Sequence, residues 1–189
     1  MIPSRPHNKN HRLPEKEYYE FFDKVDAGDI FFSSGDSFID SVNRWYQKKL
    51  LRNKECGHVS HVGIIDDYGF MIESRGKIGP TRDFHISNRL EGKERKLIIG
   101  KVVYDHDNVD IERAISAILE YMTVVPRGYD FMSLFSFGRI QSNNKVICSE
   151  LVGFYLNNLL RANMDFTLIM DKLILPREMI DFVEVTVTV

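Results

Sequence analysis

The sequence is poor in the features that mark several large classes of protein. Its 189 residues include only two cysteines, Cys56 and Cys148, so a framework of disulfide bonds is not expected to stabilise it. No stretch approaches the roughly 18 uninterrupted apolar residues of a membrane-spanning helix. The first residues lack the apolar run of a secretory signal. We therefore predict a cytoplasmic protein without an integral membrane segment.

Net charge is also small. The 25 basic and 27 acidic residues give a net charge of −2, which provides no general electrostatic attraction to nucleic acid or anionic lipid. We predict no nucleic-acid partner. Apolar residues make up 43% of the chain and charged residues 28%, which is ordinary for a soluble globular protein and excludes a disordered or fibrous chain.

The distribution of polar residues predicts two parts of very different size. Residues 1–14 are polar and contain three prolines, which predicts a flexible arm. Residues 15–189 contain no internal repeat, no low-complexity tract and no long linker. They predict a single α+β domain whose core draws on 13 phenylalanines and 8 tyrosines.

Hydrophobic periodicity predicts the order of helices and strands. Helices are expected over 15–25 and 38–51, from a cap at Asn108 through Met122, and from a cap at Asn143 or Asn144 through Leu159. Strands are expected over 30–32, 59–65, 70–73, 97–104 and 182–189. Residues 75–96 are expected to be loop or irregular structure.

Three residues stand out as candidates for chemistry: Cys148, His61 and Glu73. Each alone is more often structural, because a lone cysteine on an apolar helix face is usually a small core residue. Cys148, however, falls early in a predicted helix, where the unpaired N–H groups and the helix dipole favour the nucleophilic thiolate.

The loop between two predicted strands decides whether His61 and Glu73 can meet. A three-residue loop that ends at Gly69 in the left-handed conformation would pair Gly63 with Glu73. His61 and Glu73 would then be diagonal neighbours on one sheet face, within reach of a hydrogen bond. A loop of two or four residues would place them on opposite faces, because side chains alternate with period two.

The remaining histidines support other interpretations less well. Cys56, His58 and His61 form a cluster that could suggest zinc, but a structural zinc site needs four ligands and no second pair follows at finger spacing. We expect no metal. His85 and His106 fall in predicted loops and are expected at the surface.

Four motifs occur in a fixed order along the chain. They are Gly28-Asp29-Ile30-Phe31-Phe32, Ser60-His61-Val62-Gly63-Ile64, Met71-Ile72-Glu73-Ser74 and Ile147-Cys148-Ser149-Glu150-Leu151-Val152. Together they resemble the circularly permuted branch of the NlpC-type, papain-like cysteine hydrolases, which contains the YiiX-like amidases and their poxviral relatives. The resemblance runs from about Gly28 to Leu160 and weakly beyond.

The resemblance implies a fold, an activity and roles for residues. The fold would be an antiparallel papain-like sheet packed against helices, and the activity cysteine-dependent hydrolysis of amide bonds without a cofactor. Cys148 would be the nucleophile, His61 the general base and acid, and Glu73 the residue that orients the imidazole. Tyr129 would line the site or donate to the oxyanion, although a core-packing role is equally expected for it.

The resemblance leaves the substrate class open. A peptide or an acylated small molecule is the first expectation, and a lipid-like substrate of a phospholipase or acyltransferase is the second. A catalytically inert binding module on the same fold is the third. Because the family has poxviral members, a viral or phage origin is compatible with the sequence.

Overall fold

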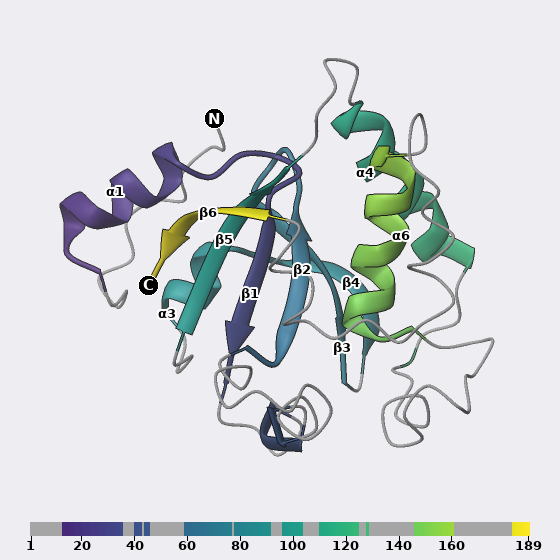
Figure 1. Ribbon diagram of the computed structural model, residues 1–189, viewed down its shortest axis with the longest axis horizontal. Helices are drawn as coiled ribbons and strands as arrows, with labels where there is room; N and C mark the ends of the chain where they lie inside the picture. The colour runs from purple at the N-terminus through teal and green to yellow at the C-terminus, as the bar shows by residue number, and fades with distance from the viewer. Residues whose placement is uncertain are drawn as a thin grey trace.

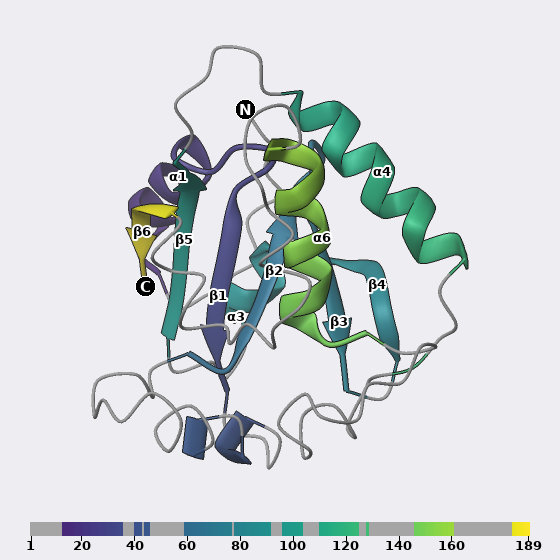
Figure 2. The ribbon, with the colours of Figure 1, turned by 45° about the vertical axis from the view of Figure 1, so that its right-hand side comes forward.

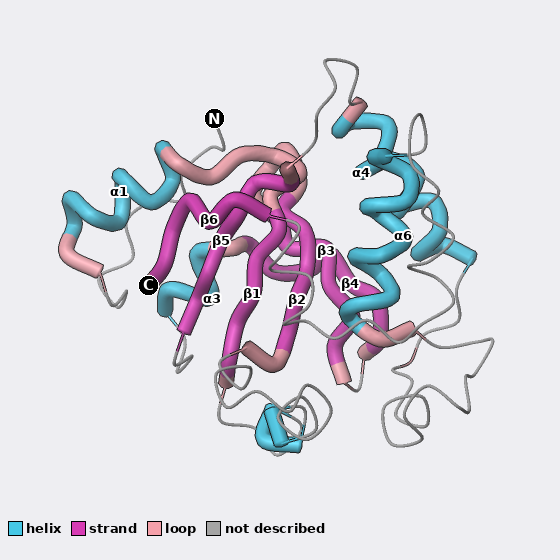
Figure 3. The backbone as a smooth tube through the Cα atoms, in the orientation of Figure 1, coloured by secondary structure: helices cyan, strands magenta, loops and turns pink. Residues whose placement is uncertain are grey.

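The computed structural model describes residues 13–35, 40–42, 44–45, 59–76, 78–91, 96–103, 110–124, 128, 146–160 and 183–189. Their architecture is α+β, as the sequence predicts: one antiparallel sheet lies between helices (Figure 1; Figure 3). The predicted arm, residues 1–14, falls almost wholly outside the described residues. None of the described helices is long and apolar enough to cross a membrane.

The strands follow the order β4-β3-β2-β1-β5-β6 across the sheet. Their bounds are β1 (Ile30–Ser34), β2 (His61–Ile65), β3 (Phe70–Arg75), β4 (Gly79–His85), β5 (Lys96–Val102) and β6 (Val183–Thr188). The helices are α1 (Glu15–Asp23), α3 (Ser87–Glu91), α4 (Ile111–Val124) and α6 (Cys148–Leu160).

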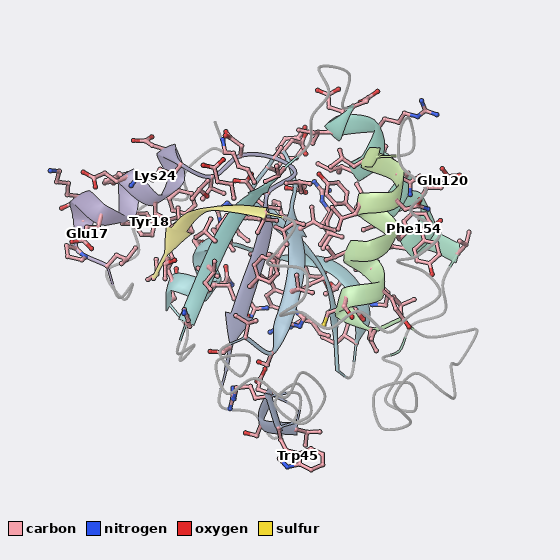
Figure 4. All side chains as sticks on the ribbon, viewed as in Figure 1. Glu17, Tyr18, Lys24, Trp45, Glu120 and Phe154 are labelled. Atoms are coloured by element: carbon pink, nitrogen blue, oxygen red, sulfur yellow. The ribbon has the colours of Figure 1, made fainter. Side chains whose placement is uncertain are left out.

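The core is divided in two by the sheet. Side chains alternate along a strand, so Ile30 and Phe32 of β1 pack on the face covered by α4 and α6, while Phe31 packs on the face covered by α1 and α3. Figure 2 shows α6 lying across the central strands, and Figure 4 shows Phe154 between α6 and α4. The Phe154 ring stacks on Tyr121 of α4 at 4.3 Å between centroids. A central strand buried on both faces explains the continuous apolar run that predicted β1.

The prediction of loop for residues 75–96 is wrong. Residues 79–85 form β4 at the edge of the sheet, and residues 87–91 form α3. The register between β3 and β4 shifts between Met71 and Glu73, so β4 carries an extra residue there. This bulge breaks the period-two pattern, and β4 also begins with Gly79 and Pro80, which are weak strand formers. Pairing with β3, a tertiary effect, decides the structure of this segment.

The predicted cap of α4 is also wrong. The helix begins at Ile111, and the carboxylate of Asp110 accepts a hydrogen bond from the backbone N–H of Arg113 at 2.8 Å. Asp110 therefore satisfies an N–H group that has no partner within the helix. Asn108, the predicted cap, lies outside the described residues.

Gly63 makes room for an aromatic ring in the face of the sheet that carries α3. Gly63 pairs with Phe31 on one side and with Glu73 on the other. A Cβ atom at Gly63 would lie 2.5 Å from the Phe31 ring and 2.8 Å from the carbonyl oxygen of Ile72. The Phe31 ring therefore occupies the space that any other residue at position 63 would fill.

Gly63→Ala should destabilise the fold, because both the Phe31 ring and a backbone carbonyl would have to move. Overpacking of this kind costs about 1–3 kcal/mol, and chemical denaturation would measure it. The Gly63→Ala/Phe31→Leu double variant should lose less stability than the two single variants together, since the smaller side chain relieves the ring contact. An unchanged denaturation midpoint for Gly63→Ala would contradict this packing argument.

Candidate active site

The β2–β3 hairpin has the register that brings His61 and Glu73 together. The backbone N–H of Asp66 donates to the carbonyl oxygen of Phe70, and Gly69 has a φ of 78°. Gly63 pairs with Glu73. These are the features of the three-residue loop, so the predicted register is confirmed and the two side chains are diagonal neighbours.

The two side chains make a direct contact. Nε2 of His61 lies 2.6 Å from Oε2 of Glu73. The Glu73 side chain is fully buried, whereas 16% of the His61 side chain is exposed. The His61 ring also contacts the ring of Phe31, with 6.0 Å between the centroids. The position of His61 therefore depends on the Phe31 ring, for which Gly63 leaves room.

Cys148 is the first residue of α6, which is later in the chain than the predicted start near Asn144. The Glu150 carboxylate accepts the backbone N–H of Ile147 at 3.0 Å and thereby caps the helix. The predicted caps Asn143 and Asn144 lie outside the described residues. Cys148 therefore sits at the positive end of the helix dipole, and it is buried, with 3% of its surface exposed.

Cys148 acts on the charge of His61. Burial favours neutral imidazole, but the charge and hydrogen bonding of Cys148 act in the opposite direction, joined by Glu73. These influences outweigh burial and raise the pKa of His61 from 6.5 to about 9. The imidazole is therefore protonated at neutral pH, between a sulfur and a carboxylate.

Glu73 stays ionised although it is buried. Burial alone would raise its pKa, but hydrogen bonding and charge from His61, with further charge from Arg89 and Arg75, lower the pKa to about 2. The pKa in the folded state is thus below the ordinary value of 4.5. The pair therefore stabilises the fold above pH 4.5, and this contribution is lost as the pH falls through 2.

Ser74 joins the strand that carries Glu73 to the segment that carries Cys148. Its hydroxyl donates to the carbonyl oxygen of Val146 at 2.6 Å, and both residues are buried. Because Val146 precedes Cys148 by two residues, this bond fixes the start of α6 against β3. The sequence analysis did not assign Ser74 a role, although it follows Glu73 directly in the Glu-Ser motif.

Two arginines next to Glu73 also escaped the sequence analysis. Arg89 of α3 donates from Nη2 to Oε2 of Glu73 at 2.5 Å, and Nε of Arg75 lies 3.7 Å from Oε1. Arg89 fell within the segment predicted to be loop, so no pattern connected it with the hairpin. Arg75 lies two residues after the predicted strand 70–73, and nothing in the sequence pattern connected its charge with Glu73.

Several predicted residues are not part of this cluster. His85, predicted at the surface, is buried at the end of β4, where its ring stacks on Phe22 and its Nδ1 accepts the N–H of Ser87. That prediction is wrong because the residue belongs to a strand rather than to a loop. Tyr129, Cys56, His58 and His106 lie outside the described residues. In the described part of the chain, no group of three or more His, Cys, Asp or Glu side chains could hold a metal ion.

No protein-family model matches the chain, and no curated protein sequence is significantly similar to it.

We expect the His61 ring to titrate with a midpoint near pH 9 in the wild-type protein, as measured by NMR of its ring resonances. The Cys148→Ala variant should lower this midpoint, because it removes the strongest influence that raises the pKa. Since the folded-state value exceeds 6.5, His61 should stabilise the fold below about pH 6.5 and lose that effect as the pH rises through 9. The same midpoint in both proteins would show that the sulfur does not act on His61.

Ser74→Ala should lower the free energy of unfolding by about 1–3 kcal/mol, because it leaves the buried Val146 carbonyl without this donor. It should also slow alkylation of Cys148, since the start of α6 loses its link to β3. Denaturation and mass spectrometry of the alkylated peptide would measure the two effects. A stability loss with unchanged alkylation would show that Ser74 supports the fold without positioning Cys148.

Proposed function

We propose that the protein is a thiol hydrolase that cleaves amide bonds through Cys148, His61 and Glu73. The observation that carries the proposal is the chain of contacts from a cysteine at a helix N-terminus, through a protonated histidine, to a buried ionised carboxylate. This combination activates a sulfur nucleophile and supplies a proton donor beside it.

The first half of the reaction forms a thioester. The Cys148 sulfur attacks the carbonyl carbon, and a C–S bond forms as the carbonyl electrons move to oxygen. Nε2 of His61 is hydrogen-bonded to Glu73. Nδ1 is therefore the nitrogen that interacts with the sulfur and donates a proton to the leaving group. His61 gives its proton to the leaving nitrogen, the C–N bond breaks, and an amine departs.

The second half restores the enzyme. The imidazole, now neutral, accepts a proton from water as the water oxygen attacks the thioester carbon. The C–S bond breaks, the acid is released, and His61 is again protonated beside Cys148. Glu73 holds the ring in one orientation through both halves, because its carboxylate accepts the Nε2 hydrogen bond.

The N-terminus of α6 supports the charge that develops on the substrate oxygen. The first N–H groups of a helix have no acceptor within the helix, and the helix dipole is positive there. The N–H of Cys148 is the donor closest to the reacting sulfur and is our first candidate for the oxyanion site.

The resemblance to the permuted NlpC-type hydrolases fits this proposal. Along the chain, β2 carries the histidine, β3 the acid, and α6 the cysteine, which is the order of that family. We propose that the α+β fold is the permuted papain-like one and that the substrate is a peptide or an acylated small molecule.

The burial of Cys148 favours a second candidate function. Only 3% of its surface is exposed, which fits a closed site on an inert binding module. The two functions differ in whether a reagent or substrate reaches the sulfur.

Alkylation by iodoacetamide, measured at each cysteine by peptide mass spectrometry, would separate these functions. Cys148 should react at pH 6, where an ordinary thiol with a pKa near 8.5 is protonated, and Cys56 should lag. His61→Gln should slow the reaction of Cys148 at this pH by about 10²–10⁴-fold, the usual contribution of a positioned acid or base. Glu73→Gln should have an intermediate effect, because it keeps the shape of the side chain and removes its charge.

A panel of peptide amides, acyl amides and phospholipid esters would then identify the bond that is cleaved. Trapping of an acyl group on Cys148 from an amide, with no trapping on Cys148→Ala, is the expected result. Trapping from phospholipid esters alone would assign the site to lipid chemistry. If Cys148 stays unreactive up to the pH at which ordinary thiols ionise, the hydrolase proposal fails and the binding module is favoured.

A further inference from the structure

One oxygen of the Glu73 carboxylate is shared by two cations from different elements. Oε2 lies 2.6 Å from Nε2 of His61 and accepts a hydrogen bond from Nη2 of Arg89 at 2.5 Å. Among the residues that the structure describes, Oε1 has only the longer ion pair with Arg75, at 3.7 Å between Nε and oxygen. The carboxylate that contacts His61 is thus also held by Arg89, from a different element.

Arg89 is itself held in place. Ile86, directly before α3, and Leu90, directly after Arg89, are fully buried and anchor α3 against the sheet. Its guanidinium lies over the Phe31 ring, 5.4 Å from the centroid, and 11% of its side chain is exposed. A planar cation fixed in this way presents its donors in one orientation.

The ring of Phe31 lies against both partners of Glu73. It contacts both the His61 ring and the Arg89 guanidinium. The geometry points to a four-residue unit, Cys148–His61–Glu73–Arg89, in which Arg89 is a positioning residue for the Glu73–His61 pair. This inference rests on the hydrolase proposed above and extends it by one residue.

The charge of Arg89 matters most when His61 is neutral. In the proposed reaction His61 gives its proton to the leaving group, and for that interval the fully buried Glu73 loses its imidazolium partner. A buried carboxylate without a cation takes up a proton or moves. Arg89 cannot lose its proton in this way, so it keeps Glu73 ionised and in place until His61 is protonated again.

Arg89 also moderates the effect of Glu73 on His61. Two donors on one oxygen share its negative charge, so each receives a weaker interaction than it would alone. Without Arg89, the interaction between the Glu73 carboxylate and the His61 imidazolium should become stronger. The midpoint of the imidazole titration should therefore rise. An imidazolium that holds its proton more tightly releases it to a leaving group less readily.

Arg75 provides a matched control. It faces the same carboxylate from the other oxygen, at a longer distance and with 36% of its side chain exposed. Arg75→Gln therefore removes a cation near Glu73 and leaves the shared oxygen with both of its donors. Arg89→Lys is the conservative variant, because it keeps the charge and loses the planar group.

The experiment measures two quantities in wild type, Arg89→Gln, Arg89→Lys and Arg75→Gln. The first is the His61 titration midpoint by NMR, with the resonances assigned by their loss in His61→Gln. The second is the rate of Cys148 alkylation by iodoacetamide against pH. Arg89→Gln should raise the His61 midpoint and slow alkylation at pH 7 by about 10- to 100-fold, the range found when the partner that orients a metal-binding histidine is removed.

The controls decide whether Arg89 positions or only stabilises. Arg89→Lys should restore part of both effects, and Arg75→Gln should shift both quantities distinctly less than Arg89→Gln. A lowered melting temperature in Arg89→Gln, with a His61 midpoint and an alkylation profile no different from those of Arg75→Gln, would overturn the inference. If Arg89→Gln does not fold, the Lys variant still tests it, because wild-type values of both quantities in that variant would show that the planar group does not position Glu73.

The two proposals can fail separately. If wild-type Cys148 is unreactive, the hydrolase proposal fails, but the His61 midpoint still reports whether Arg89 acts on the Glu73–His61 pair. If wild-type Cys148 is reactive and Arg89→Gln shifts neither quantity, the hydrolase stands and the role of Arg89 is rejected.

Discussion

The buried carboxylate of Glu73 is the constraint around which this part of the molecule is arranged. An ion that leaves water without compensation costs several kcal/mol, so its neighbours must supply charge and hydrogen bonds. Here the compensation comes from both sides: β2 contributes His61, and α3 contributes Arg89. The short helix α3 carries Arg89, and the Phe31 ring, for which Gly63 leaves room, lies against Arg89. Both features therefore help to hold a cation beside the same carboxylate oxygen.

The second half of the site depends on a different kind of interaction. Cys148 belongs to the opposite side of the core, among the residues that pack against α4 and α6, and it approaches His61 from there. Its place is fixed by backbone contacts: the Ser74–Val146 bond and the Glu150 cap at the start of α6. The charged residues His61, Glu73 and Arg89 thus lie on one face of the sheet. The N-terminus of α6, which hydrogen bonds hold in position, lies on the other face.

The predictable part of the structure is local. The turn residues 67–69 and the alternation around them were sufficient to predict the pairing of Gly63 with Glu73, because loop length fixes the register of a hairpin. Arg89 and the bulge in β4 could not be predicted this way. The extra residue in β4 hides the strand pattern, and α3 is too short for a helical period to be visible. The start of α6 was misplaced because Glu150 caps the helix from within, whereas the asparagines upstream carried the usual signal.

The distances along the chain between these partners bear on how the molecule folds. His61 and Glu73 are 12 positions apart and share one hairpin, whereas Ser74 and Val146 are separated by 72 positions. Contacts between distant segments close large loops and form late. The His61–Glu73 pair can therefore assemble before the segment that carries Cys148 has docked on the sheet. The reactivity proposed for the sulfur then requires the finished tertiary structure, because a species that holds only the hairpin lacks the partner of His61 on α6.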